Sequence, residues 1–357
     1  MYHVVLTACL ISAPEACESR LLPAGDAPDL QACIAGAETI ARDWLARHPD
    51  LSAQGQDCVP TQDLAALELA EIADGVWLHQ GAAGQISAEN RGWIANLGVV
   101  IGDSIAVIDP GASRAQGEAL YAAIRQHSDR PVSHVILTHM HPDHILGAEV
   151  FAEAGARVTA NARLPDALAL RGESWLRSIP DQIGTGALAG TRLVAVDITI
   201  GARQVIDLGA RDLILTPVPP AHTDNDMTVL DSATGTLFTG DLVFQGGLTP
   251  SIDGSLSGWL DWIDLGPPQG PDGAPPRLIV PGHGPVSDSW DAATAPGRRY
   301  LDRLRATIRD QIAQGAALSA AIPETVAAMQ DLAPEWLDFD AVTARNAATA
   351  YAELEWE

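Results

Sequence analysis

Four side chains of metal-binding type lie within six residues at His139, His141, Asp143 and His144, directly after the apolar run 132–137. Three imidazoles and a carboxylate packed this closely lose solvation and repel one another on protonation, and a bound divalent cation offsets both costs. The two histidines of the H-x-H pair point to one side, whereas the Asp-His pair turns to the other. The cluster therefore predicts a strand end that carries ligands for two metal ions.

Three more candidate ligands follow later in the chain, each just past a short β-like run. Loops at strand ends are the places where a rigid sheet can aim a side chain into a site. We therefore expect these residues to join the first cluster. The predicted metal ligands are His139, His141, Asp143, His144, His222, Asp241 and His283.

Each of these residues also has a simpler explanation. A structural zinc site is disfavoured because such sites are closed spheres rich in cysteine. An isolated His222 or His283 would more often be a surface or core imidazole, and Asp241 after Thr-Gly would pass for a turn residue; only the first cluster favours them as ligands. The other histidines lack ligand neighbours and are expected to be structural: His3, His48, His79, His127 and His134.

The complete ligand pattern resembles the metallo-β-lactamase-fold superfamily, whose metal motif is H-x-H-x-D-H followed by a distant His, an Asp and a final His. The resemblance covers residues 70 to 290 and fills every motif position. It implies that one zinc ion is held by His139, His141 and His222, and a second by Asp143, His144 and His283, with Asp241 bridging the two.

Finer resemblances point to two branches of this superfamily. The bridging Asp241 resembles glyoxalase II rather than the true β-lactamases, and diiron flavoproteins of this fold carry Glu where this chain has His141. Segments 221–226 and 251–260, with the cysteine-bearing N-terminal segment, are similar to quinoprotein relay system zinc metallohydrolases. That resemblance implies a periplasmic location and a quinoprotein dehydrogenase or cytochrome as partner, on which the N-terminal segment would dock.

These observations predict a zinc hydrolase with two zinc ions per chain, in which a metal-bound hydroxide attacks a small acyl substrate: a thioester, lactone, ester or lactam. Asp143 and Asp241 belong to this catalytic centre as ligands. Arg91, Trp93 and Trp259 are candidates for substrate contact, as is the loop 251–258, and plain structural roles are equally open to them. The alternative is a mononuclear iron enzyme similar to persulfide dioxygenases, since imidazole and carboxylate accept both metals.

The charge of the chain limits the classes of substrate and partner. The 357 residues carry 46 acidic side chains against 21 basic ones, a net charge of −25, and every basic residue is Arg. Phosphate binding relies on positive surface, so we expect no nucleic acid and no anionic membrane surface as partner. The absence of lysine excludes Schiff-base chemistry. A small molecule is the expected substrate, and the sequence leaves the oligomeric state open.

All cysteines lie in the first 58 residues, at Cys9, Cys17, Cys33 and Cys58. An even number in a short segment favours two disulfides formed in an oxidising compartment, although the sequence does not choose among the three pairings. Reduced cysteines packed as small hydrophobes are the alternative, and a four-thiolate zinc site is weakened by the lack of any C-x-x-C pair. The first residues lack the basic start of a secretory signal.

Hydrophobic spacing divides the chain into three parts. Residues 1–62 predict a small strand-helix-strand unit with helical spacing over 30–47. Residues 63–292 interleave strands and helices in two similar halves, which predicts an α/β fold of two stacked sheets with helices outside, the αββα sandwich. Residues 293–357 predict a helical extension, which either packs on the parent domain or forms a dimer contact.

Overall fold

The computed structural model describes residues 1–250 and 253–356 and contains the predicted αββα sandwich. The first sheet has the strand order β10-β9-β8-β7-β6-β5-β4. Its strands are β4 (Ala70–Ala73), β5 (Val76–His79), β6 (Leu97–Ile101), β7 (Ile105–Ile108), β8 (Val132–Leu137), β9 (Arg157–Asn161) and β10 (Ile198–Ile200). Strands β7 to β10 pair in parallel, so their carboxyl ends meet at one edge.

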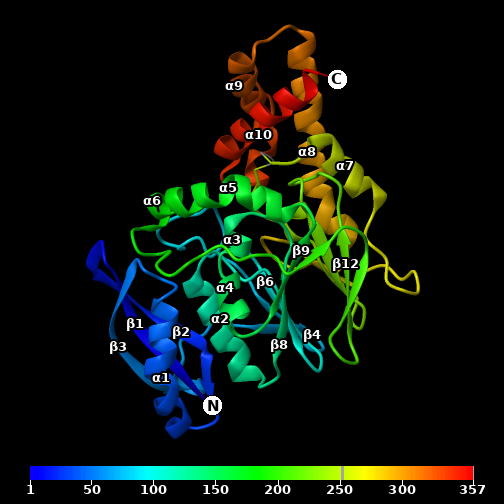
Figure 1. Ribbon diagram of the computed structural model, residues 1–357. Helices are drawn as coiled ribbons and strands as arrows, with labels where there is room; N and C mark the ends of the chain where they lie inside the picture. Colours follow the sequence, from blue (N-terminus) through cyan, green and yellow to red (C-terminus); the bar gives the residue numbers. More distant parts are fainter. Residues whose placement is uncertain (251–252, 357) are drawn as a thin grey trace.

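The second sheet has the order β11-β12-β13-β14-β15 and packs on the first. Its strands are β11 (Gln204–Asp207), β12 (Asp212–Pro217), β13 (Met227–Asp231), β14 (Thr236–Phe238) and β15 (Leu278–Val280). Only the β14–β15 pair is parallel. Helices flank the two sheets (Figure 1), with α2 (Arg114–His127), α3 (Pro142–Ile145), α4 (Ala148–Glu153), α5 (Leu164–Ser178) and α6 (Pro180–Ile183) following strands of the first, and α7 (Leu256–Leu265) and α8 (Trp290–Ala313) following those of the second.

The core consists of layers that match this arrangement. Val100 and Ile136 of the first sheet meet Leu215 and Phe238 of the second. Such inward-facing aliphatic side chains are fully removed from water, each contributing roughly 1.5–3 kcal/mol. A Cβ at Gly98 would overlap the ring of Phe238, so the glycine allows the sheets to approach at this point.

The N-terminal unit is a separate small sheet with the order β2-β1-β3, covered on one face by a helix. Its elements are β1 (Tyr2–Leu10), β2 (Ala13–Ala27), α1 (Leu30–Leu45) and β3 (Leu51–Pro60), followed by the 3-10 turn η1 (Thr61–Asp63). The long strand β2 was not expected, because Pro14, Pro23 and Gly25 weaken the strand pattern. It is an edge strand, the position in a sheet that tolerates proline.

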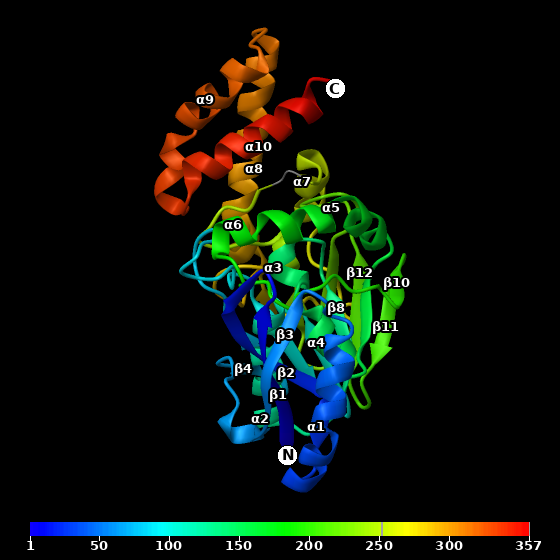
Figure 2. The same ribbon diagram turned by 60° about the vertical axis from the view of Figure 1, so that its left-hand side comes forward.

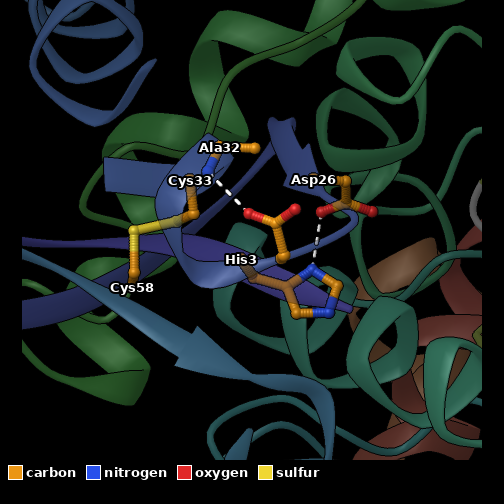
Figure 3. Close-up of a disulfide and its surroundings, with 6 residues drawn as sticks. His3, Asp26, Ala32, Cys33 and Cys58 are labelled. Atoms are coloured by element: carbon orange, nitrogen blue, oxygen red, sulfur yellow. Dashed lines mark hydrogen bonds and ion pairs between the residues drawn. A yellow bond between two sulfur atoms is a disulfide. The ribbon is translucent and has the colours of Figure 1, made fainter. Parts of the chain in front are cut away.

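Two disulfides staple this unit, as the cysteine count suggested. Cys9 and Cys17 face each other across β1 and β2, and Cys33 of α1 is joined to Cys58 of β3 (Figure 3). The helix begins close to the second bridge, where the Asp29 carboxylate accepts a hydrogen bond from the backbone N–H of Ala32 at 2.9 Å. The two bridges fit a protein that folds in an oxidising environment.

A buried charge network joins the N-terminal unit to the sandwich. Arg114 of α2 is fully buried and binds Glu118, Glu149 and Glu153 at 2.7, 3.1 and 2.7 Å. Its guanidinium also lies 4.8 Å from the ring centre of Trp44 in α1. Arg20 of β2 reaches Glu118 at 3.1 Å. The N-terminal unit is therefore docked on the sandwich through charged side chains that are largely buried.

The C-terminal helices lie at the opposite end of the molecule from the N-terminal unit (Figures 1 and 2). They are α9 (Leu318–Ala328), the 3-10 segment η3 (Gln330–Glu335) and α10 (Phe339–Leu354), packed with α8 and α7 in one core. The Glu353 carboxylate of α10 accepts hydrogen bonds from the backbone N–H of Leu256 at 2.7 Å and the hydroxyl of Ser255 at 3.0 Å. The extension thus packs on the parent domain. Within the described chain, no helix combines the length and apolar character needed to span a bilayer.

The two disulfides should stabilise the protein unequally. They close segments of 25 and 8 residues for Cys33–Cys58 and Cys9–Cys17, and chain entropy predicts losses of about 3.5 and about 2.5 kcal/mol of unfolding free energy on removal. We expect urea unfolding of the Cys33→Ser/Cys58→Ser double variant to show the larger loss.

Thiol titration of the unfolded, non-reduced wild-type chain should find almost no free thiol; four free thiols would contradict the bridges.

Replacing Arg114 by Met should destabilise the protein by about 3–5 kcal/mol, because it removes the buried positive charge that three glutamates share. Urea unfolding measures the change. Arg42→Met is the matched control, since Arg42 is exposed and, among the residues that the structure describes, forms an ion pair only with the exposed Asp43; its cost should stay below about 0.5 kcal/mol. Equal costs for the two variants would show that the network does not hold the unit in place.

Candidate metal centre

The predicted ligands meet at one edge of the sandwich, each from a loop that follows a strand. His139 and His141 follow β8, and Asp143 and His144 belong to the short helix α3. The remaining ligands come from the second sheet, with His222 after β12, Asp241 in the 3-10 turn η2 (Gly240–Leu242) after β14, and His283 after β15. Both sheets therefore contribute, and the site lies where their strand ends converge.

The structure brings all seven residues together in two groups. Within each group, the ligand atoms lie within 4.8 Å of one another. The first group contains His139, His141, His222 and Asp241, and the second contains Asp143, His144 and His283. These are the groupings that the sequence motif implied, and each can hold a metal ion.

Asp241 lies between the two groups, with one carboxylate oxygen toward each. Its Oδ1 is 3.2 Å from Nε2 of both His144 and His283. Its Oδ2 is 3.5 Å from Nε2 of His222 and 3.8 Å from Nε2 of His139. This is the arrangement of a carboxylate that bridges two cations.

Hydrogen bonds behind the rings fix the protonation of the histidines. His283 donates through Nδ1 to the carbonyl of Ile94 at 2.9 Å, so its Nε2 is free to face the site. His144 donates through Nδ1 to Asp109 at 2.8 Å, and His141 through Nε2 to Asp253 at 3.1 Å. Such outer partners are typical of metal-binding histidines because they orient the ring and select its tautomer.

A Thr-Asp pair fixes a fourth ring. The Thr138 hydroxyl donates to Asp109 at 2.7 Å and can therefore accept from Nδ1 of His139 at 3.0 Å. The Nε2 atom of His139 is buried and has no hydrogen-bond partner in the described chain. Its lone pair points into the first group, which is how an imidazole presents itself to a metal.

The ring nitrogens that face each other lie close together within each group. Nδ1 of His141 lies 2.9 Å from Nε2 of His222, and Nε2 of His144 lies 3.3 Å from Nε2 of His283. In their neutral ligand form, these atoms direct lone pairs at one another. A positive charge shared by them removes this repulsion, so the residues present fit a bound divalent metal.

Burial and neighbouring charges prepare the groups for this role. Burial, followed by the neighbouring imidazoles, holds the pKa of His139 and of His222 well below the ordinary value, which keeps both neutral. Burial alone would raise the pKa of Asp241, but His283 and His144 hold it well below the usual range. Burial alone would lower the pKa of His144 and of His283. The neighbouring carboxylates, chiefly Asp241, outweigh burial and raise both pKa values when no metal is bound. Metal binding there displaces protons and weakens as pH falls.

Two glycines make room for the bridging carboxylate. A Cβ at Gly282 would occupy the position of Asp241 Oδ1, and a Cβ at Gly240 would lie 2.6 Å from the Thr138 hydroxyl. Gly240 also has a φ of +53°, a conformation that favours glycine. The Gly-Asp and Gly-His sequences around two ligands therefore have a steric cause.

A pocket of about 490 Å³ opens over the metal-binding groups. His141 and His283 line it and are the most exposed ligands, with side chains 14% and 18% exposed, whereas His139, His144 and His222 are buried. Its apolar walls come from Ile86, Ile94, Trp175, Leu248 and Leu337. A ligand in the pocket would therefore contact the open side of both groups.

The three residues proposed as substrate contacts do not line this pocket. Arg91 pairs with Glu18 of the N-terminal unit at 3.5 Å and lies over the ring of Trp93. Trp259 is completely buried behind His222, at 5.1 Å between ring centres, and donates to the Leu242 carbonyl at 2.9 Å. Position in the sequence could not distinguish a side chain that supports a ligand from one that faces the substrate.

The loop 251–258 is partly described. Ser251 and Ile252 lie outside the described residues, whereas Asp253 lines the pocket and accepts the hydrogen bond from His141. Arg171 of α5 forms an ion pair with the same carboxylate. The prediction of a pocket-lining loop here thus holds for Asp253.

Sequence reasoning missed the outer partners Asp109, Thr138 and Asp253. Asp109 gave a signal, because it directly follows the strand β7 and precedes Pro-Gly; it adopts a φ of +55°, which is rare outside glycine. Thr138 directly precedes the first histidine. Asp253 had no local signal, since it reaches His141 only through the tertiary fold.

Comparisons with known proteins agree with this geometry. The model of the Metallo-beta-lactamase superfamily matches residues 91–300. Among curated proteins, the uncharacterized protein YobT of Bacillus subtilis (strain 168) is 28% identical over 135 residues, which are 37% of this chain and 53% of that protein. The chain thus spans about half the length of this relative.

Solved structures share the fold at low sequence identity. A metallo-beta-lactamase from Pontibacter korlensis is 20% identical with a TM-score of 0.53, and the match covers 66% of this chain and 99% of that one. The stereoselective inverting sec-alkylsulfatase Pisa1 from Pseudomonas sp. is 17% identical with a TM-score of 0.59, over 82% of this chain and 50% of that one. Similarity at this level establishes the fold alone.

Replacing Asp241 by Asn should weaken metal binding, and more in the group of Asp143, His144 and His283, to which it lies closer. Loss of an outer partner costs roughly tenfold to hundredfold in metal affinity, and a bridging ligand should cost at least as much. Titration against a chromophoric chelator measures both affinities. Asp264→Asn, at an exposed carboxylate, is the control. Unchanged binding of every metal ion in Asp241→Asn would contradict the bridging role.

Proposed function

This chain belongs to the metallo-beta-lactamase superfamily, and from that premise we propose that it is a hydrolase with two zinc ions that cleaves a small acyl compound. Thioesters and lactones are the leading substrates, followed by esters and lactams. The observation that carries the proposal is the position of Asp241, whose two oxygens face two separate groups of ligand atoms. A site for one metal has no use for the second complete group.

The donor set favours zinc. It contains five imidazoles and two carboxylates, and each group leaves room for a non-protein ligand on the side of the pocket. Catalytic zinc sites are built from such nitrogen and oxygen donors with an open position. Iron accepts the same donors, so a persulfide dioxygenase remains the competing reaction, decided by metal content.

Zinc ions bound there would supply hydroxide near neutral pH and polarise the oxygen of a scissile bond. The residues of this chain do the remaining work. The ligands hold their positions through Asp109, Asp253 and the Ile94 carbonyl, so little reorganisation is needed when substrate arrives. The apolar walls exclude water from the bound acyl group. No cysteine is available as a nucleophile, because all four are paired in the N-terminal unit.

A sulfate ester is the second candidate substrate. The likeness to sec-alkylsulfatase extends over 82% of this chain, compared with 66% for the lactamase. A larger share of this chain, beyond that matched by the lactamase, therefore has a counterpart in an enzyme of that name. Sulfate esters belong in the same substrate panel as the acyl compounds.

The proposed setting is the periplasm, beside a quinoprotein dehydrogenase or cytochrome whose product this enzyme would hydrolyse. Two disulfides support an oxidising compartment. The N-terminal unit is the proposed docking part, since it contributes none of the metal ligands. The net negative charge of the whole chain suits a partner with a basic surface.

The central test is hydrolysis of this panel before and after chelation. Activity should disappear with the chelator and return with zinc, and elemental analysis should find close to two zinc ions per chain. His141→Ala should lower kcat/KM by about a thousandfold or more, because metal catalysis supplies several kcal/mol. His127→Ala, at an exposed histidine far from the ligands, should retain full activity.

Two results would overturn the proposal. Stoichiometric iron with oxygen consumption on a persulfide would establish the dioxygenase. Hydrolysis that persists in His141→Ala would place the chemistry outside this centre.

A further inference from the structure

One arginine of the C-terminal extension lines the pocket above the metal-binding groups. Arg345 belongs to α10, and among the described lining residues it is the sole Arg, while the chain contains no lysine. The uncharged polar residues that line the pocket include four glutamines, which are Gln80, Gln85, Gln182 and Gln245. The pocket thus has its metal-binding floor, apolar walls and a single arginine.

The acidic residues of the same pocket are already engaged. Asp143 and Asp241 belong to the metal-binding groups, and Asp253 binds His141 and Arg171. Within the described residues, the Arg345 side chain forms no ion pair and no hydrogen bond. In a protein with 46 acidic residues and 21 arginines, an arginine in a pocket without a carboxylate partner is available for a ligand.

Helix α10 holds the backbone of Arg345 in a fixed place beside the pocket, and the residue is exposed. At its start, Asp338 accepts a hydrogen bond from the backbone N–H of Gln85 at 3.3 Å, and Leu337 donates through its N–H to the Gly246 carbonyl at 2.9 Å. Beside Arg345, the Asn346 amide donates to the Thr249 carbonyl at 3.3 Å. The two pocket-lining segments that contain Gln85 and Gly246 are therefore hydrogen-bonded to α10 or to the residues directly before it.

The net charge of −25 repels an anionic molecule from most of the surface. An anion that enters this pocket needs local positive charge, and it finds it at two places, the metal centre and Arg345. Guanidinium groups bind carboxylates through paired, charge-assisted hydrogen bonds. The apolar side chains that line the same pocket suit a hydrocarbon segment.

We propose that Arg345 binds a carboxylate at the end of the substrate remote from the bond that is cleaved. The substrate is then an acyl compound with an apolar body and a terminal carboxylate. This assignment rests on the proposed hydrolase function and narrows its substrate class. Arg345 acts in specificity, since it touches the substrate away from the reacting atoms.

Binding and turnover test the assignment separately. For binding, calorimetry of the zinc-loaded protein compares α,ω-dicarboxylates from succinate to sebacate with their monomethyl esters. One carboxylate of each probe can occupy the metal centre, so the second reports on Arg345. At the best length, wild type should prefer the diacid by about tenfold or more, as expected for a hydrogen bond between charged groups. Arg345→Gln should lose this preference, and Arg345→Lys should keep part of it.

Arg303→Gln is the matched control, because this substitution removes the same charge from the same extension. Arg303 lies on α8, outside the pocket lining. This variant should bind every probe like wild type. A wild type that binds diacids and monoesters equally at every length, or an Arg345→Gln variant that keeps the preference, would overturn the assignment.

Turnover separates this inference from the proposed function. Thioesters of the same diacids and of their monomethyl esters serve as substrates, and Arg345→Gln should raise KM for the acid series by about tenfold or more with little change for the ester series. If neither series is hydrolysed while the binding preference is found, the hydrolase proposal fails and the anion site stands. If both are hydrolysed alike by both proteins, the anion site fails and the hydrolase stands.

Discussion

The close packing of imidazole nitrogens around Asp241 is the constraint on which the rest of the structure depends. Ring nitrogen atoms approach one another to 2.9 and 3.3 Å in the two groups, and Asp241 faces both. No apolar packing produces such an arrangement, because it gains nothing by bringing these atoms together. The outer hydrogen bonds to Asp109 and Asp253, and the glycines that make room for Asp241, serve to maintain it. The strand ends of two sheets supply the rigidity that this requires.

The sequence predicted the parts of this site that depend on local pattern. Ligands that follow short apolar runs were recognised because strand ends aim side chains, and the two-sheet sandwich followed from interleaved strands and helices. Arg91, Trp93 and Trp259 were candidates for substrate contact but do not line the pocket, because no local pattern distinguishes a supporting side chain from one that faces the pocket. The same limit hid Arg345, which reaches the pocket from α10. Strand β2 was missed because prolines at a sheet edge read as a loop.

The N-terminal unit differs from the rest in how it is held. Its own stability draws on two covalent bridges, whereas its attachment to the sandwich uses the buried Arg114 network. Buried ion pairs give little net stability but impose a strict geometry, because a misplaced partner leaves a charge without solvation. A partner protein that binds this unit would therefore meet a surface set at a fixed orientation to the pocket.

The contact between Glu353 and the first turn of α7 has a consequence for the order of assembly. Helix α7 presents Trp259 to the back of His222, so this proposed metal ligand packs on a helix whose N-terminus is capped from α10. Synthesis proceeds from the N-terminus, so all the proposed ligands leave the ribosome before α10, the helix that caps α7 and so supports His222. We therefore expect metal loading to follow completion of the helical extension, which makes acquisition of the cofactor a late step in maturation.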